Sequence, residues 1–160
     1  MDNARSWWLR TGIRLAVDIG STRIGIARCD PDGRLASPLT TISRGHGDID
    51  ALAALAAWER AIEIVVGLPT GLSGREGAAR ASVAANARAC AAVPVRLVDE
   101  RFTTVIAHDA LRRGGRGARE RRPVVDQAAA ALILQGALDA ERSTGRPAGE
   151  LVGPAPGAGG

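Results

Sequence analysis

The chain has 160 residues, of which 46% are hydrophobic, and its formal net charge is +4 at pH 7. This length suits one domain with its own core. No apolar run approaches the roughly 18 residues of a membrane-spanning helix, and the first residues lack the apolar stretch of a secretory signal. The composition therefore predicts a soluble cytoplasmic domain without a membrane partner.

Three apolar segments near the start of the chain predict an antiparallel meander. They run over residues 14–20, 23–29 and 35–43. Only Ser21 and Thr22 separate the first two segments, and the turn-forming sequence Asp-Pro-Asp-Gly at 30–33 separates the second from the third. Such short turns join antiparallel neighbours.

Helices and strands alternate over the rest of the chain, which is typical of a parallel sheet. Two β-branched runs predict buried strands at 62–69 and 93–100. Helical spacing of apolar residues predicts helices at 48–61, 75–92, 103–115 and 123–142. Asp48 and Pro123 suit the starts of the first and last helix. The predicted fold class is α/β, with a mixed five-stranded sheet flanked by helices, in which the last two strands run parallel to the first.

The predicted organisation is a flexible tail at 1–12, one folded domain at 13–143, and a disordered Gly/Pro/Ala-rich tail at 144–160. A glycine-rich loop is expected at 70–77. The two cysteines, Cys29 and Cys90, are expected to be reduced, and no zinc-ligand spacing is present.

Three acids stand in unusual places. Asp18 lies in the middle of an apolar strand, Glu100 closes the strand at 93–100, and Asp126 lies in an apolar helical stretch on the side that faces the sheet. Each alone has an ordinary structural explanation, such as an ion pair or a favourable helix start. Together, three converging carboxylates repel each other unless a cation lies between them.

Oxygen ligands of this kind suit Mg²⁺ or Mn²⁺. A site with two such ions, about 3.5–4 Å apart, can cleave a phosphodiester by in-line attack. We expect the ions to bind weakly without substrate, because hydrated Mg²⁺ gives up its waters reluctantly.

Four segments resemble the motifs of the YqgF (RuvX-like) family. They are VDIGSTRIGIA, IVVGLPTGLSG, VDERFTT and VVDQAAAALILQGAL, within residues 13–142. The resemblance implies a ribonuclease H-like fold, similar to that of Holliday-junction resolvases. It implies that Asp18, Glu100 and Asp126 are the metal-binding catalytic acids. It also implies processing of the 5′ end of pre-16S ribosomal RNA, with resolution of four-way DNA junctions as the alternative, by a monomer or a homodimer.

One departure from the family pattern lies beside the first acid. The family usually reads D-x-G-x-x-R with a charged residue after the glycine, whereas Ser21 and Thr22 stand there and Arg23 is kept. The carboxylate of Asp18 is untouched, so this departure concerns substrate contact rather than the metal site.

Arginines are the predicted contacts to nucleic acid. They are Arg23, Arg101, Arg112, Arg113, Arg116, Arg119, Arg121 and Arg122. Six of them fall in a predicted mobile loop at 111–122, which is either a phosphate-binding surface or a solvated charge run. Gly67, Gly71 and Gly74 either form a loop whose backbone contacts a phosphate or merely allow a tight connection from a strand to a helix. Aromatic residues are scarce, so base stacking is not expected to dominate, and Trp58 is expected in the core.

Two other function classes fit parts of the sequence. The stretch Asp-Ile-Gly-Ser-Thr at 18–22 also resembles the phosphate-binding hairpin of the actin and sugar-kinase superfamily, but the chain is too short for the two domains that close on ATP. A non-catalytic RNA-binding module of the same fold is the other alternative, and the three intact acids argue against it.

Overall fold

The computed structural model describes residues 10–68, 74–99 and 118–152, without the side chains of residues 68, 74–77, 79–80 and 118–123. The strands are β1 (Arg14–Ile19), β2 (Arg23–Cys29), β3 (Ala36–Ser43), β4 (Glu63–Leu68), β5 (Val95–Asp99) and β6 (Glu150–Leu151). The helices are α1 (Asp48–Trp58), α2 (Gly74–Cys90) and α4 (Ala118–Thr144). The helix predicted at 103–115 lies outside the described residues.

The strands form one mixed sheet in the order β3-β2-β1-β4-β5-β6. The meander β1-β2-β3 is antiparallel, and β4 and β5 run parallel to β1. The predicted fold class is therefore confirmed. The predicted number of strands is wrong, because the described residues contain a sixth strand, β6, which pairs antiparallel with β5.

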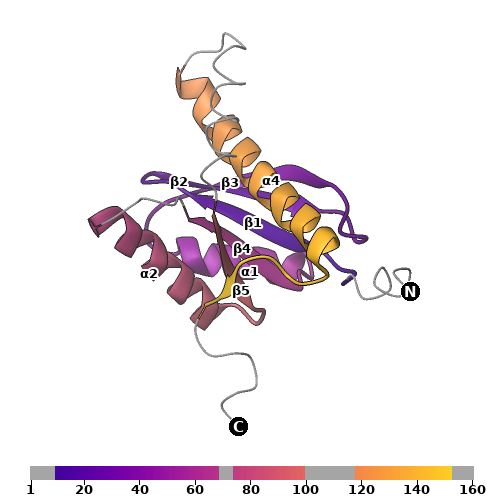
Figure 1. The fold of residues 1–160 in the computed structure, drawn as a ribbon. Coiled ribbons are helices and arrows are strands. Elements are labelled where there is room, and N and C mark those ends of the chain that lie inside the picture. The colour runs from indigo at the N-terminus through magenta and orange to yellow at the C-terminus, as the bar shows by residue number, and fades with distance from the viewer. Residues whose placement is uncertain (1–9, 69–73, 100–117, 153–160) are drawn as a thin grey trace, which may run out of the picture.

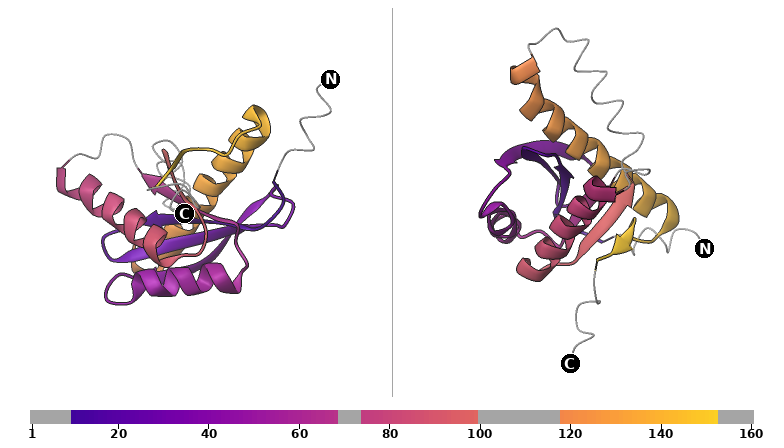
Figure 2. Two further views of the ribbon diagram at one scale, coloured as in Figure 1. Left: turned by 90° about the horizontal axis from the view of Figure 1, so that it is seen from below. Right: turned by 90° about the vertical axis from the view of Figure 1, so that its left-hand side faces the viewer.

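The described helices cover both faces of the sheet. Helix α4 crosses one face diagonally, and α1 and α2 lie on the other (Figures 1 and 2). Strand β1 lies in the middle of the sheet and is buried throughout, so its successive side chains enter two separate cores. Leu15, Val17 and Ile19 pack toward α1 and α2. Ala16 packs with Ala130, Ile133, Leu134 and Leu138 of α4.

Two helix boundaries differ from the prediction in a way that bears on function. Helix α2 begins at Gly74, so the expected loop at 70–77 is shorter. Helix α4 begins at Ala118 rather than Pro123, so residues 118–122 are helical rather than part of a loop. Proline removes one backbone hydrogen bond from a helix, and the strong helix-forming alanine, arginine and glutamate residues before it allow one more turn.

The ends of the folded domain are longer than expected. Arg10, predicted within a flexible tail, forms ion pairs with Glu63 and Glu141. Strand β6 lies in the segment predicted to be disordered, where it satisfies backbone groups along the open edge of β5. Residues 1–9 and 153–160 lie outside the described residues.

Trp58 is not in the core, because its side chain is 84% exposed. Helix α1 buries Leu52 and Ala56, which are four residues apart and share a face. Trp58 stands two residues after Ala56 and so projects from the opposite side. Gly47, not Asp48, is the N-cap of this helix, and Asp48 lies in its first turn. Cys29 and Cys90 are free, as predicted.

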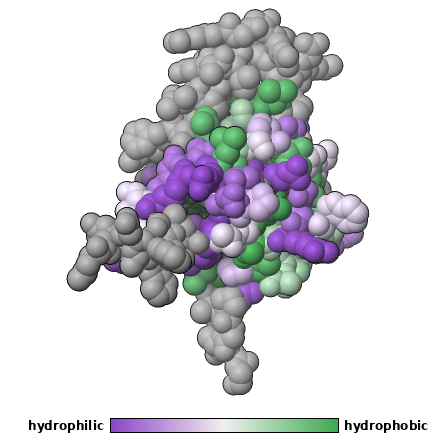
Figure 3. All heavy atoms as spheres, turned by 90° about the vertical axis from the view of Figure 1, so that its right-hand side faces the viewer, coloured by the Kyte–Doolittle hydropathy of each residue, from purple (hydrophilic) through white to green (hydrophobic). Residues whose placement is uncertain are grey.

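None of the described helices has the length and apolar character needed to cross a membrane. Seen from the right-hand side of Figure 1, the described surface is mostly hydrophilic, with small hydrophobic areas between polar residues (Figure 3).

Candidate active site

Asp18 lies in the central strand with a glycine on each side. Its register partners are Gly25 of β2 and Gly67 of β4. Only 7% of Asp18 is exposed, and the residue shares its face of the sheet with Ala16, which packs under α4. Both neighbours lack a Cβ, so neither places a side chain beside the carboxylate within the sheet. The sequence motif therefore produces a buried acid flanked by two glycines.

Asp126 lies directly above one of these glycines. A Cβ atom at Gly25 would come within 2.2 Å of the Asp126 carbonyl carbon and oxygen. Helix α4 thus approaches β2 as closely as a bare backbone permits. Because Gly25 and Asp18 are register partners, whose Cα atoms lie about 4.5–5.5 Å apart, the helix brings Asp126 beside Asp18.

An ion pair joins Asp126 to the start of β2. The Nε of Arg23 donates to Oδ2 of Asp126 over 3.1 Å. One residue further along α4, Nε2 of Gln127 donates to Oγ1 of Thr41 over 2.8 Å, which ties the same helical turn to β3. Val125 is buried next to them. This turn of α4 is therefore anchored at several points.

The β1–β2 turn beneath this ion pair is braced by a second arginine. The amide of Gly20 donates to the carbonyl of Arg23 over 2.8 Å, and Nη1 of Arg44 donates to the carbonyl of Gly20 over 2.9 Å. Arg44 also pairs with Asp48 through a 3.0 Å contact between Nε and Oδ2. Ser21 and Thr22 are exposed at the tip of this turn.

Asp48 carries a perturbed carboxyl group. Its burial alone would raise its pKa, but the amides of Gly45 and Ile49 and the guanidinium of Arg44 outweigh that effect and leave the pKa below its ordinary value. The acid is therefore a charged part of the brace at neutral pH.

Several predicted site residues fall outside what the structure describes. Glu100, Arg101, Arg112, Arg113, Arg116 and Gly71 lie outside the described residues, and Arg119, Arg121 and Arg122 are described only as backbone of α4. Within the described residues, no group of three His, Cys, Asp or Glu side chains could hold a metal ion. Of the three predicted metal-binding acids, the structure describes two, Asp18 and Asp126.

The three glycines of the predicted phosphate loop do not form one loop. Gly67 is a buried residue of β4, and its register partners are Asp18 of β1 and Val98 of β5. Gly74 is the first residue of α2. Neither glycine lies in the connection between β4 and α2.

A second charged cluster, which the sequence reading missed, lies at the other end of β1. Oε2 of Glu141 on α4 accepts from Nη2 of Arg14 over 2.7 Å, and its Oε1 accepts from Nε of Arg10 over 2.6 Å. Glu63 of β4 binds Arg10 and Arg96. Glu141 lies seven residues after the buried Leu134 on the same helical face, which is the sequence signal that could have revealed it.

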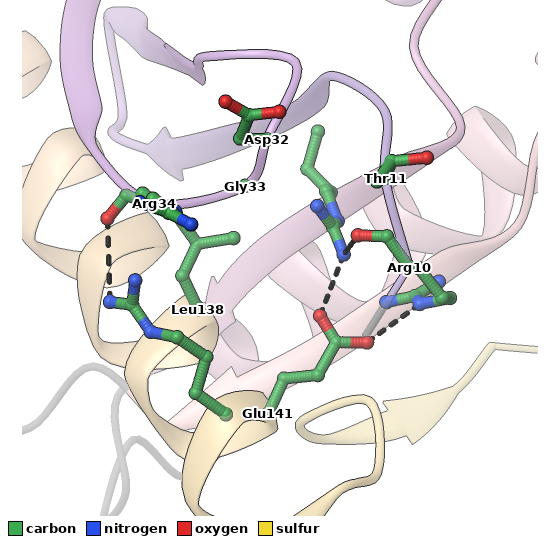
Figure 4. A pocket seen from close by; sticks show the side chains of 9 residues that line it. Arg10, Thr11, Asp32, Gly33, Arg34, Leu138 and Glu141 are labelled. Atoms are coloured by element: carbon green, nitrogen blue, oxygen red, sulfur yellow. Dashed lines mark hydrogen bonds and ion pairs between the residues drawn. The ribbon is translucent and has the colours of Figure 1, made fainter. Parts of the chain in front are cut away.

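This cluster borders a cavity of about 470 Å³. Figure 4 shows Arg10 and Arg34 on opposite sides of it, with Glu141 turned toward Arg10. Burial alone would lower the pKa of Arg10, but hydrogen bonds and charges from Glu63 and Glu141 outweigh it and hold the pKa above its ordinary value. The cluster lies four residues, or roughly 13 Å, from Asp18 along β1, and its buried acids are paired with arginines. We interpret it as a clamp between α4 and the sheet.

Comparisons with known proteins identify the family of this chain. Residues 12–140 match the family described as RuvX, Holliday junction resolvase. A protein of Thermobifida fusca named as a candidate pre-16S rRNA nuclease is 58% identical over 155 residues, which cover 90% of this chain and 98% of that protein. A protein of Nocardioides sp. with the same name is 53% identical over 153 residues, which cover 90% of this chain and 98% of that protein.

Among solved structures, Thermus thermophilus RuvC in complex with a Holliday junction substrate is similar in fold. Its TM-score is 0.54 at 18% identity, and the match covers 88% of this chain and 99% of that one. At that identity the likeness concerns the fold alone, and it agrees with the predicted ribonuclease H-like fold similar to that of Holliday-junction resolvases. The family match spans most of the chain and includes Asp18, Gly25 and Asp126. This chain belongs to the RuvX family.

Proposed function

We propose that this chain is a metal-dependent nuclease that hydrolyses phosphodiester bonds, and that its substrate is the 5′ end of pre-16S ribosomal RNA. The observation that carries the proposal is the close contact of Asp126 with Gly25, directly beside the buried Asp18. Two carboxylates brought together under a helix favour a cation between them. Membership of the RuvX family supports a nuclease, and the names of its relatives favour RNA as the substrate.

The proposed cofactor is Mg²⁺ or Mn²⁺, held by Asp18, Asp126 and Glu100. The donor set fits, because carboxylate oxygens are the ligands these ions prefer, and the missing side chain of Gly25 lets the backbone of Asp126 approach the strand beside Asp18. Glu100 directly follows Asp99, the last residue of β5, and its role rests on the sequence motif. When bound, two such ions would activate a water molecule and stabilise the leaving oxygen.

The protein side chains orient the substrate in this proposal. Asp18 is rigid because its strand is central and buried, and Asp126 is rigid because its helical turn is anchored. The arginines at 112–122 supply the positive charge that binds the nucleic-acid backbone, largely without regard to sequence. The partner is structured RNA in the cytoplasm, bound by a monomer or a homodimer.

The test is a cleavage assay with two substrates in parallel. A pre-16S fragment and a four-way DNA junction are incubated with Mg²⁺ or Mn²⁺ and with the wild-type chain or the Asp18→Asn variant. Asp50→Asn, an exposed acid of α1 on the opposite face of the sheet, is the matched control. We expect the wild type and Asp50→Asn to cleave the RNA fragment, and Asp18→Asn to leave it intact.

Each other outcome changes the assignment. Preferential cutting of the junction would replace RNA processing by junction resolution. Binding without metal-dependent cleavage of either substrate would indicate a non-catalytic RNA-binding module. Full cleavage by Asp18→Asn would refute the metal site itself.

A further inference from the structure

Arg23 holds Asp126 through only one of its nitrogens. Nε makes the 3.1 Å contact, and within the described part of the chain Nη1 and Nη2 take part in no hydrogen bond or ion pair. The arginine side chain is 28% exposed and the Asp126 side chain 19%. The two outer nitrogens of the guanidinium are therefore accessible, and they match the geometry of a phosphate group.

Asp126 does not need Arg23 to hold its position. The contact of its backbone with Gly25, the burial of Val125 and the hydrogen bond from Gln127 to Thr41 fix this turn of α4 independently. The ion pair consequently contributes charge neutralisation more than geometry.

Arg23 is fixed at its backbone but not at its guanidinium. Its carbonyl accepts from Gly20, and its strand position pairs with Ser43 of β3. The long side chain can therefore change partner by rotation alone, while the backbone stays in place.

We propose that Arg23 is an exchangeable counterion of the candidate metal site. It neutralises Asp126 while no divalent cation is bound, and it passes to a phosphate of the nucleic acid when a cation takes over Asp126. This inference rests on the proposed function. A carboxylate that binds a cation attracts the guanidinium less, and the cation repels it.

Two linked consequences follow from this exchange. Arg23 competes with the cation for Asp126, so it weakens metal binding when no nucleic acid is present. Coupling between two binding events is reciprocal, so the cation increases the contribution of Arg23 to nucleic-acid binding. The exchange thereby gives a physical reason for a metal site that fills mainly when substrate arrives.

The first measurement is calorimetric titration of the metal-free protein with Mn²⁺ in the absence of nucleic acid. In Arg23→Gln a neutral donor replaces the guanidinium, and in Arg23→Ala the contact is removed. We expect both variants to bind Mn²⁺ roughly twofold to fivefold more tightly than the wild type, the scale of one partly exposed charge pair. The matched control is Arg28→Gln on the same strand, because Arg28 pairs with Glu59 over 2.8 Å on the other face of the sheet. Its Mn²⁺ affinity should equal that of the wild type.

The second measurement is the affinity for a pre-16S fragment, by filter binding, in Ca²⁺ and in EDTA. Ca²⁺ also takes carboxylate oxygens as ligands. We expect Arg23→Gln to lose affinity in Ca²⁺, by roughly threefold to tenfold for one phosphate contact, and to lose much less in EDTA. Arg28→Gln should show the same small change in both conditions.

The outcomes separate this inference from the proposed function. A wild-type protein that binds no Mn²⁺ even in the presence of the pre-16S fragment would refute both. If the wild type binds Mn²⁺ and Arg23→Gln binds it equally or more weakly, with an unchanged melting temperature in EDTA, the exchange is refuted and the metal site stands. An equal loss of nucleic-acid affinity in Ca²⁺ and EDTA would also refute the exchange.

Discussion

The Gly25→Ala substitution tests the contact on which the candidate site depends. A Cβ at Gly25 would lie 2.2 Å from the Asp126 carbonyl atoms and 2.7 Å from its Cβ, whereas ordinary contacts begin at 3.4 Å. The obstructing atoms are helix backbone, and β2 is held between β1 and β3. Helix α4 must therefore move away from the sheet by about 1 Å.

This displacement has two measurable costs. Forcing an extra methyl group into a packed contact destabilises a protein by about 1–3 kcal/mol, and each kcal/mol lowers the melting temperature by about 2–4 °C in a chain of this size. A misplacement of about 1 Å at a catalytic group can lower the rate by about 10²-fold. We therefore expect Gly25→Ala to remain folded but to lose most of its cleavage activity.

The assay combines the initial rate of pre-16S fragment cleavage in Mn²⁺ with the melting temperature in EDTA. Gly136→Ala is the matched control, because Gly136 lies on the same helix and a Cβ there meets nothing within 4 Å. Replacing a glycine by alanine inside a helix stabilises it by about 1 kcal/mol, so this control should melt slightly higher and cleave normally. A folded Gly25→Ala variant with the wild-type rate would show that catalysis does not depend on the close contact between Asp126 and Gly25.

Three further predictions concern the acids and the arginine run. Asp126→Ala should lower turnover strongly while the melting temperature stays nearly unchanged, because alanine favours the helix. Nucleic-acid affinity should not fall, because the released Arg23 can bind phosphate; loss of all three properties together would make Asp126 a structural acid. The variant in which alanine replaces Arg112, Arg113, Arg119 and Arg121 should bind all sequences more weakly to the same degree. The slope of log affinity against log salt concentration should become shallower by about 0.7–0.9 for each lost phosphate contact. An unchanged slope would show that these arginines are ordinary surface charges. Asp48→Asn should lower the melting temperature more at pH 7 than at pH 2. A carboxyl whose pKa is lowered by folding stabilises the protein above its unfolded pKa of about 3.9 and loses that effect as the pH falls through its folded value; an equal loss at both pH values would contradict the charged brace.

Local patterns were sufficient to predict the central strands, the class of sheet and the family. The apolar run around Asp18 and the short turn at Ser21 and Thr22 specify β1 and β2, because alternation and turn chemistry act between near neighbours in sequence. The placement of Asp126 toward the sheet also followed from helical spacing, since the adjacent residues at 129, 130 and 133 are apolar.

The tertiary structure decided what depends on pairing between distant segments. The ion pair of Arg23 with Asp126 joins residues 103 positions apart, and that of Arg10 with Glu141 joins residues 131 positions apart. No local pattern encodes such a partner, since each charge has many possible partners along the chain until the fold brings two of them together. The same holds for β6, whose two residues become a strand only because β5 offers it an open edge. A glycine inside a strand permits the close approach of another backbone or of a ligand, and only the packed helix shows that the neighbour of Gly25 is Asp126.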